Sequence, residues 1–172
     1  VDFLRDLHLG LHRHSQGCCN THRGLLNFAC SNGGRSGPTE GSIVMALAAS
    51  GFDASVGEIT MALSLGAHIV IVPRDIATDG LRLSKALDDT RATLFFGSPA
   101  TFQLLFAAGW RGHAGMTVVS GGETLTRDLA GALAERAGAV WNVYGPTEAA
   151  VWVSRSLVSP VPPRIPIGAP MA

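Results

Sequence analysis

The chain has 172 residues, of which 47% are hydrophobic and 15% are charged, and its formal net charge is zero. This composition fits one globular domain, or a piece of a larger one. The balanced charge argues against a nucleic-acid or anionic-membrane partner, and no apolar run reaches the ~18 residues of a membrane span. No secretory signal is recognisable, and three cysteines are too few for a disulfide framework, so we expect a cytoplasmic protein.

The first 20 residues lack the pattern of a folded segment, and we expect no regular structure there. They are rich in imidazole and thiol groups, the usual ligands of zinc. These groups belong to His8, His12, His14, Cys18, Cys19 and, just beyond the segment, His22. Their spacing matches no familiar zinc pattern, so a metal- or protein-binding module stays an alternative interpretation of this stretch.

From residue 21 onwards, apolar periodicity and turn residues predict an alternation of strands and helices. The expected helices cover residues 22–30, 55–65, 79–88, 98–108 and 125–137, and the first has Thr21 as its cap. The expected strands cover residues 43–48, 67–72, 92–96, 117–120 and 140–144. Such alternation predicts an α/β fold, with a mostly parallel sheet and helices on both faces.

The last part of the chain differs in composition. Residues 160–172 are rich in proline, which excludes a regular helix. We expect an extended connector there.

Polar and aromatic residues follow several of the predicted strands directly. They are Asp53, Phe96, residues 121–123 and residues 144–148. Because the carboxyl ends of parallel strands share one edge of a sheet, and ligands bind at that edge, we expect these segments to form one nucleotide and substrate cleft.

The segment 141–153 carries the most specific of these signals. Gly145 and Pro146 end the predicted strand and force a turn. Thr147 and Glu148 follow, and a hydroxyl and a carboxylate suit a phosphate and its Mg²⁺, a cation that takes oxygen ligands. Tyr144 offers a flat ring on which a base can stack. A surface turn with an incidental acid is the alternative for this segment taken alone.

Four segments in order resemble the motifs of nonribosomal peptide synthetase adenylation domains. Residues 142–148 resemble the core motif, and residues 51–59 resemble the Phe-Asp-x-Ser segment. Residues 120–123 resemble the Gly-Gly-Glu loop beside adenine, and residues 165–170 resemble the Pro-Ile-Gly-x-Pro stretch. The resemblance runs from about Thr21 to the end of the chain. It implies that residues 21–159 belong to the large N-terminal subdomain of an adenylate-forming enzyme.

The resemblance implies that an amino acid and ATP give an aminoacyl adenylate and pyrophosphate, and that the aminoacyl group then forms a thioester. The cofactors would be ATP, Mg²⁺ and the phosphopantetheine of a carrier domain, and the partners would be peptidyl carrier and condensation domains. Catalytic roles fall on Thr147 and Glu148, with Glu148 holding Mg²⁺. The implied nucleotide-binding residues are Gly121, Gly122, Glu123, Asn142, Tyr144, Gly145 and Thr147.

The family's substrate pocket maps onto nine positions of this chain. They are Asp53, Ala54, Gly57, Phe96, Val119, Gly121, Val143, Val151 and Trp152. Asp53 is a candidate cap of the following helix, and the resemblance implies that it is the partner of the substrate's α-ammonium group. The two roles are compatible, and we favour the second. The other positions are apolar, and an apolar wall leaves a polar side chain unpaired at a cost of roughly 1–3 kcal/mol. We expect a hydrophobic substrate of leucine or aromatic type, with space at Gly57 and less at Phe96 and Trp152.

One family motif is missing. The family has a Ser/Thr/Gly-rich phosphate-binding loop just before the segment that matches residues 21–24. Residues 5–19 can be back-translated with codons that the genetic code permits for them. When that DNA is read one base later, its translation is Val-Ile-Tyr-Thr-Ser-Gly-Ser-Thr-Gly-Thr-Pro-Lys-Gly-Val, which has the loop's composition and its expected spacing from His22. We therefore interpret residues 1–20 as a frame-shifted remnant of that loop. Leucine and histidine cannot replace glycine where backbone N–H groups approach a phosphate, so the chain as written should lack its triphosphate site.

Another enzyme of the same superfamily, an acyl- or aryl-CoA ligase, is the alternative activity, and Asp53 argues against it because those substrates have no amine. The family's catalytic lysine and ribose-binding aspartate match no residue of this sequence. We therefore expect the chain to be an interior fragment that is inactive alone.

Overall fold

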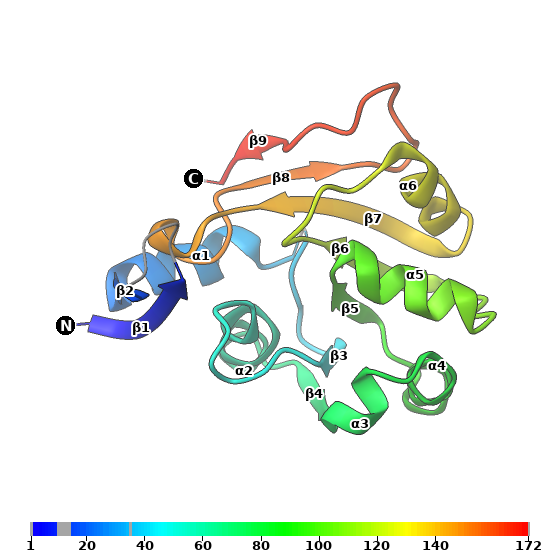
Figure 1. Ribbon diagram of the computed structural model, residues 1–172, viewed down its shortest axis with the longest axis horizontal. Helices are drawn as coiled ribbons and strands as arrows, with labels where there is room; N and C mark the ends of the chain where they lie inside the picture. The colour runs from blue at the N-terminus through cyan, green and yellow to red at the C-terminus, as the bar shows by residue number, and fades with distance from the viewer. Residues whose placement is uncertain (1, 10–14, 35, 172) are drawn as a thin grey trace.

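The computed structural model describes residues 2–9, 15–34 and 36–171, and the side chains from residue 17 onwards. A seven-stranded sheet with strand order β4-β3-β5-β6-β7-β8-β9 forms the centre of the molecule (Figure 1). Its parallel strands are β3 (Ile43–Ala46), β4 (His68–Ile71), β5 (Leu94–Gly97), β6 (His113–Ser120) and β7 (Ala137–Tyr144). The predicted parallel sheet is confirmed.

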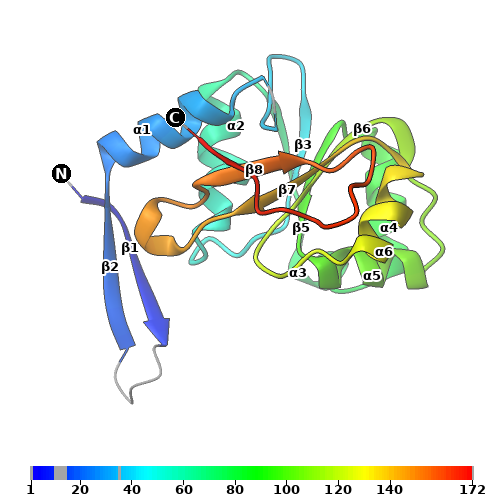
Figure 2. The same cartoon turned by 90° about the horizontal axis from the view of Figure 1, so that it is seen from above.

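Helices cover both faces of this sheet, as the sequence predicts (Figures 1 and 2). On one face lie α4 (Gly80–Thr90), α5 (Pro99–Ala107) and α6 (Arg127–Ala134). On the other lie α1 (His22–Asn32), the π-helix η1 (Val56–Met61) and α2 (Ala62–Ser64). A short helix, α3 (Arg74–Ala77), follows β4 and was not predicted.

Two hydrophobic cores result, because neighbouring residues of a strand point to opposite faces. Met45 and Phe95 pack into the core under α4, α5 and α6. Val44 and Phe96 pack into the core under α1 and η1. All four side chains are buried. A strand that is buried on both faces reads as a continuous apolar run, and this explains why the sequence signal was clear.

Local capping contacts explain several helix starts. The Thr21 hydroxyl accepts a hydrogen bond from the Gly24 N–H at 3.1 Å, which confirms the predicted cap. Ser98 caps α5 in the same way, through the Thr101 N–H at 3.2 Å. The expected α-helix at 55–65 is instead a π-helix over Val56–Met61, and π-helical turns are frequent at functional sites.

The carboxyl-terminal part adds two antiparallel strands that were not predicted. They are β8 (Ser154–Leu157), paired with β7, and β9 (Ala169–Pro170), paired with β8. The segment expected as an extended connector thus ends as an edge strand, the position in a sheet where proline is tolerated. Gly168 has φ +97°, and a Cβ there would overlap the backbone of Arg155, so this return requires glycine.

The expectation of no regular structure in the first 20 residues is wrong. β1 (Asp2–Leu9) and β2 (Ser15–Thr21) form an antiparallel pair, which extends away from the large sheet (Figure 2). Strand pairing satisfies backbone N–H and C=O groups whatever the side chains are, so an unfamiliar side-chain pattern does not exclude it. Residues 10–14 and the side chains of His8, His12 and His14 lie outside the described part of the structure.

Within the described residues, no helix has the length and apolar character that crossing a membrane requires. The same residues contain no group of three or more His, Cys, Asp or Glu side chains that could hold a metal ion.

Candidate active site

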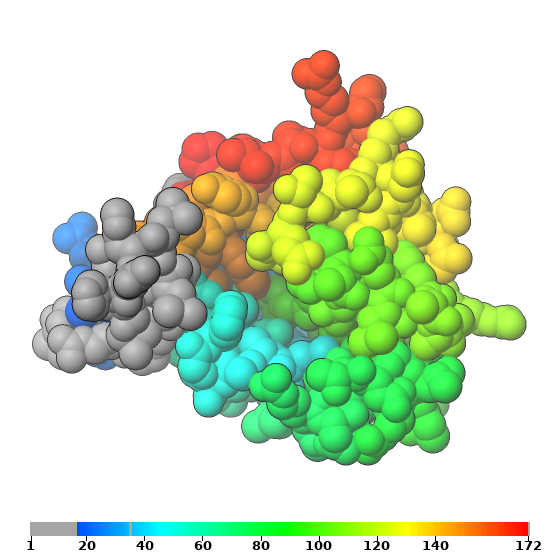
Figure 3. Space-filling view, viewed as in Figure 1, coloured from blue at the N-terminus to red at the C-terminus, as the bar shows by residue number. Residues whose placement is uncertain are grey.

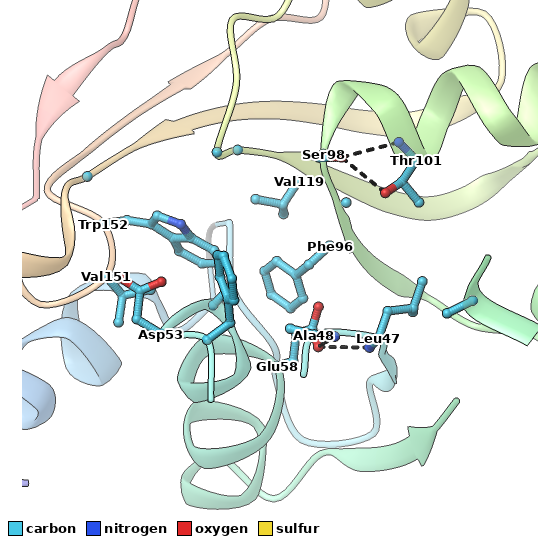
Figure 4. Close-up of a pocket in the computed structure, with 17 residues that line it drawn as sticks. Leu47, Ala48, Asp53, Glu58, Phe96, Ser98, Thr101, Val119, Val151 and Trp152 are labelled. Carbon is cyan, nitrogen blue, oxygen red and sulfur yellow. Dashed lines mark hydrogen bonds between the residues drawn. The ribbon is translucent and has the colours of Figure 1, made fainter. Parts of the chain in front are cut away.

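A cavity of about 360 Å³ lies at the carboxyl ends of β3, β5 and β6 (Figure 4). Its lining includes Asp53, Phe96, Gly121 and Trp152, which come from four separate segments. The space-filling view shows a hollow on this face, between the cyan segment around residue 50 and the orange segment around residue 150 (Figure 3). The structure therefore brings together segments that the sequence placed at a common edge.

A second cavity, of about 330 Å³, adjoins the first. It is lined by Glu123, Asn142 and Tyr144, among others, and it shares Gly122 and Gly145 with the first cavity. Tyr144 lines this cavity and is half exposed, so its side chain is accessible to a ligand. The side-chain amide of Asn142 donates to the Pro166 carbonyl at 2.8 Å, which ties the proline-rich segment to this cavity.

Of the nine predicted substrate-pocket positions, seven line the first cavity and two do not. Gly57 lies behind Trp152, because a Cβ on Gly57 would meet the Trp152 ring at 3.0 Å. The space that we expected at Gly57 is therefore filled by the indole. Val143 lies behind Gly121 and lines the second cavity.

An aromatic wall bounds the first cavity. The rings of Phe96 and Trp152 stack with centroids 5.3 Å apart, and Phe28 meets Trp152 edge-on at 5.4 Å. Trp152 follows two non-glycine residues with positive φ, Ala150 at 61° and Val151 at 76°. Such a backbone is strained, above all for a β-branched residue, by about 1–3 kcal/mol per residue. Here it turns the chain sharply enough to direct the indole into the cavity.

Asp53 does not cap the following helix, so the capping interpretation is wrong. η1 begins after Ser55 with no side-chain cap. The Asp53 carboxylate instead accepts a hydrogen bond from the Thr147 hydroxyl at 2.6 Å. Thr147 is itself buried, and its carbonyl accepts from the Asn20 amide at 2.7 Å. Three segments that are far apart in the sequence therefore meet beside the cavity.

Glu58 is a second carboxylate on the lining of the first cavity. Its Oε2 accepts from the N–H groups of Leu47 at 2.8 Å and Ala48 at 2.7 Å (Figure 4). Burial raises the pKa of Glu58 from 4.5 to about 7, although the two backbone hydrogen bonds act in the opposite direction. Glu58 thus fixes the chain after β3 against η1.

The sequence interpretation missed several lining residues, namely Leu47, Ala48, Phe52, Glu58, Ala77, Gly97, Ser98 and Thr101. Leu47 and Ala48 directly follow β3, and Ser98 directly follows β5. Phe96 was predicted to line the site because it lies at the carboxyl end of a strand. The same criterion could have identified Leu47, Ala48 and Ser98. Ala77 lies on the unpredicted helix α3 and carried no signal.

Glu148 lies on the short helix η2 (Thr147–Ala149), where its side chain is exposed. It lines neither of the two cavities, but it adjoins the buried Thr147. A single exposed carboxylate is a sufficient protein ligand for Mg²⁺, since this ion keeps several waters and takes the remaining oxygens from phosphates. The residues present therefore fit the ion that the sequence implied.

The sheet, the two adjoining cavities and their motifs define a known class of protein. The profile of the family described as "AMP-binding enzyme" matches residues 15–172, and the chain belongs to this family. Within the family, its relatives are nonribosomal peptide synthetases, and the chain corresponds to part of their adenylation domain.

Among curated proteins, the hybrid polyketide–nonribosomal peptide synthetase acdB of Aspergillus candidus is 33% identical over 135 residues. The match covers 78% of this chain and 5% of that synthetase.

Solved structures agree with this placement. A four-domain nonribosomal peptide synthetase bound to AMP and glycine superimposes with a TM-score of 0.90 at 30% identity, over 99% of this chain and 13% of that one. The N-terminal subdomain of Klebsiella oxytoca NpsA, in complex with anthranilyl-AMSN, shares the fold with a TM-score of 0.86 at 22% identity. That match covers 99% of this chain and 45% of that one. The fold is thus that of an adenylation N-terminal subdomain.

Proposed function

We propose that the protein to which this chain belongs activates an amino acid with ATP. The products are an aminoacyl adenylate and pyrophosphate, and the aminoacyl group then passes to the phosphopantetheine thiol of a carrier domain. The observation that carries this proposal is the pair of cavities joined at Gly122 and Gly145. One contains the carboxylate of Asp53, and the other contains the open ring of Tyr144.

The first cavity receives the amino acid. The Asp53 carboxylate binds the α-ammonium group, because opposite charges that also hydrogen-bond are the strong pairs in a partly desolvated site. Nine other side chains of the lining are apolar, those of Leu47, Ala48, Phe52, Ala54, Ala77, Phe96, Val119, Val151 and Trp152. They favour a hydrophobic substrate side chain, of leucine or aromatic type.

The second cavity receives the nucleotide. Tyr144 stacks on the base, and residues 121–123 and Asn142 lie along its edge. Thr147 lines neither cavity but lies beside Asp53, and from there it contacts a phosphate. Glu148 holds Mg²⁺ together with phosphate oxygens, and the ion neutralises charge there when bound. Positioning and charge neutralisation account for most of the catalysis of such transfers, which suits a site without an activated nucleophile among these residues.

The experiment compares each amino acid with the acid that lacks its amine. L-leucine and 4-methylpentanoate, or L-phenylalanine and 3-phenylpropanoate, are titrated while the intrinsic tryptophan fluorescence, to which Trp152 in the cavity wall contributes, is followed. In Asp53→Asn the amino acids should lose about tenfold or more in affinity, since a charged hydrogen bond contributes about 1.5–3 kcal/mol. The deaminated acids should not lose affinity.

Asp89→Asn is the control, because Asp89 is an exposed carboxylate paired with Lys85 on α4. Stronger binding of the deaminated acids by the unmodified chain would contradict amino acid activation. It would instead favour the acyl- or aryl-CoA ligase alternative.

A further inference from the structure

Asp53 and Thr147 carry the two roles that matter most in the proposed function, and they are hydrogen-bonded to each other. The Thr147 hydroxyl donates to Asp53 Oδ2 at 2.6 Å, across 94 positions of the sequence. Thr147 is only 6% exposed and lines neither cavity, and the bond is partly buried. The residue assigned to the amino acid and the residue assigned to the phosphate are therefore in direct contact in this structure.

A threonine hydroxyl has one proton to donate. While it donates to Asp53, it presents only lone pairs to a phosphate, whose oxygens also act as acceptors. The contact with Asp53 and a donated hydrogen bond to phosphate therefore exclude each other. An α-ammonium group changes this balance, since it has three N–H donors that can replace the hydroxyl at the carboxylate.

The backbone of Thr147 is held in place by two hydrogen bonds to its carbonyl. Its carbonyl accepts from the Asn20 amide at 2.7 Å and from the Ala150 N–H at 3.2 Å. Rotation of the hydroxyl about the C–O bond, or of the side chain between staggered rotamers, redirects the proton without moving the turn.

We propose that Thr147 couples the two subsites. Its hydroxyl donates to Asp53 in the unliganded protein, and it turns to the nucleotide phosphate when an ammonium group takes its place. Amino acid and nucleotide therefore strengthen each other's binding, and by linkage the factor is the same in both directions. This inference rests on the proposed function and adds a role for Thr147 as a positioning residue for Asp53.

The test measures coupling by calorimetry, with AMP and L-leucine as probes. AMP is titrated with and without saturating leucine, and leucine with and without saturating AMP. In the unmodified chain each ligand should tighten the other about fivefold or more, the usual lower range of such coupling. In Thr147→Val, which keeps the shape and removes the proton, the factor should fall below about twofold. Thr147→Ser should restore it.

Asp53→Asn gives an independent check. The asparagine carbonyl still accepts from Thr147, but it no longer attracts an ammonium group, so coupling should disappear in this variant as well. Leucine and AMP that both bind without coupling in the unmodified chain would overturn the inference alone, as would full coupling in Thr147→Val. Absence of leucine binding would contradict the proposed function and, with it, the inference.

Discussion

At the scale of single residues, Glu58 shows how burial changes the chemistry of a carboxylate. Its side chain is 4% exposed, and two backbone N–H groups share one of its oxygens. Burial destabilises the charged form by more than these two hydrogen bonds stabilise it, so the pKa rises to about 7. The acid therefore changes its charge within the physiological range.

This shift predicts a pH dependence of stability. The unfolded chain releases the Glu58 proton near pH 4.5, whereas the folded chain keeps it up to about pH 7. The free energy of unfolding should therefore fall as the pH rises across this window, by up to about 3 kcal/mol. Urea unfolding of Glu58→Gln should lack this component, because glutamine does not titrate.

Glu135→Gln serves as the matched control, since Glu135 is largely exposed beside Arg136. Its pH profile should follow that of the unmodified chain. A Glu58→Gln profile parallel to both would show that Glu58 titrates normally.

At the scale of elements, the turn from β7 to β8 depends on a close approach of two chain segments. Gly145 ends the strand, and a Cβ on it would overlap the backbone of Val151 and Trp152. Backbone atoms cannot move aside as a flexible side chain can. The glycine therefore sets the position of Trp152 and the passage between the two cavities.

We predict that Gly145→Ala lowers the free energy of unfolding by about 2 kcal/mol or more, the range typical of overpacking. It should also weaken binding of both leucine and AMP. Gly131→Ala is the contrasting variant, because Gly131 lies within α6 and a Cβ there meets no atom within 4 Å. That change should stabilise the chain by about 0.5–1 kcal/mol. Equal stabilities of the two variants in urea unfolding would contradict the steric argument.

At the scale of the whole molecule, the amino-terminal hairpin stands apart from the rest. The family match begins at residue 15, the first residue of β2. We propose that a one-base frame error replaced the phosphate-binding loop over residues 5–18. Just beyond this segment, Asn20 donates to the Thr147 carbonyl and Thr21 accepts from the Gly24 N–H, so both residues contact the part of the chain that the family match covers.

Restoring the phosphate-binding loop should increase the affinity for ATP. A chain in which residues 5–18 carry the in-frame reading should bind ATP about tenfold or more tightly than the unmodified chain, while its affinity for AMP changes little. The reason is that backbone N–H groups and a lysine would then face the outer phosphates. The control has the restored loop with alanine for its lysine. An unchanged ratio of ATP to AMP affinity, measured by calorimetry, would count against the frame error, as would a coding sequence that cannot be shifted into the loop.

The sequence by itself determined the layered α/β core and the edge at which the site lies. Strands that are buried on both faces appear in the sequence as continuous apolar runs, and helices appear as apolar residues three or four positions apart. The motif residues come just after the strand ends. All three signals lie in short stretches of sequence, so they can be read without the tertiary structure. Only the tertiary structure decided that Trp152 fills the space beside Gly57, that residues 2–9 pair with 15–21, and that Asp53 accepts from Thr147. Those outcomes depend on contacts between distant segments, whose geometry is set by packing of the whole chain.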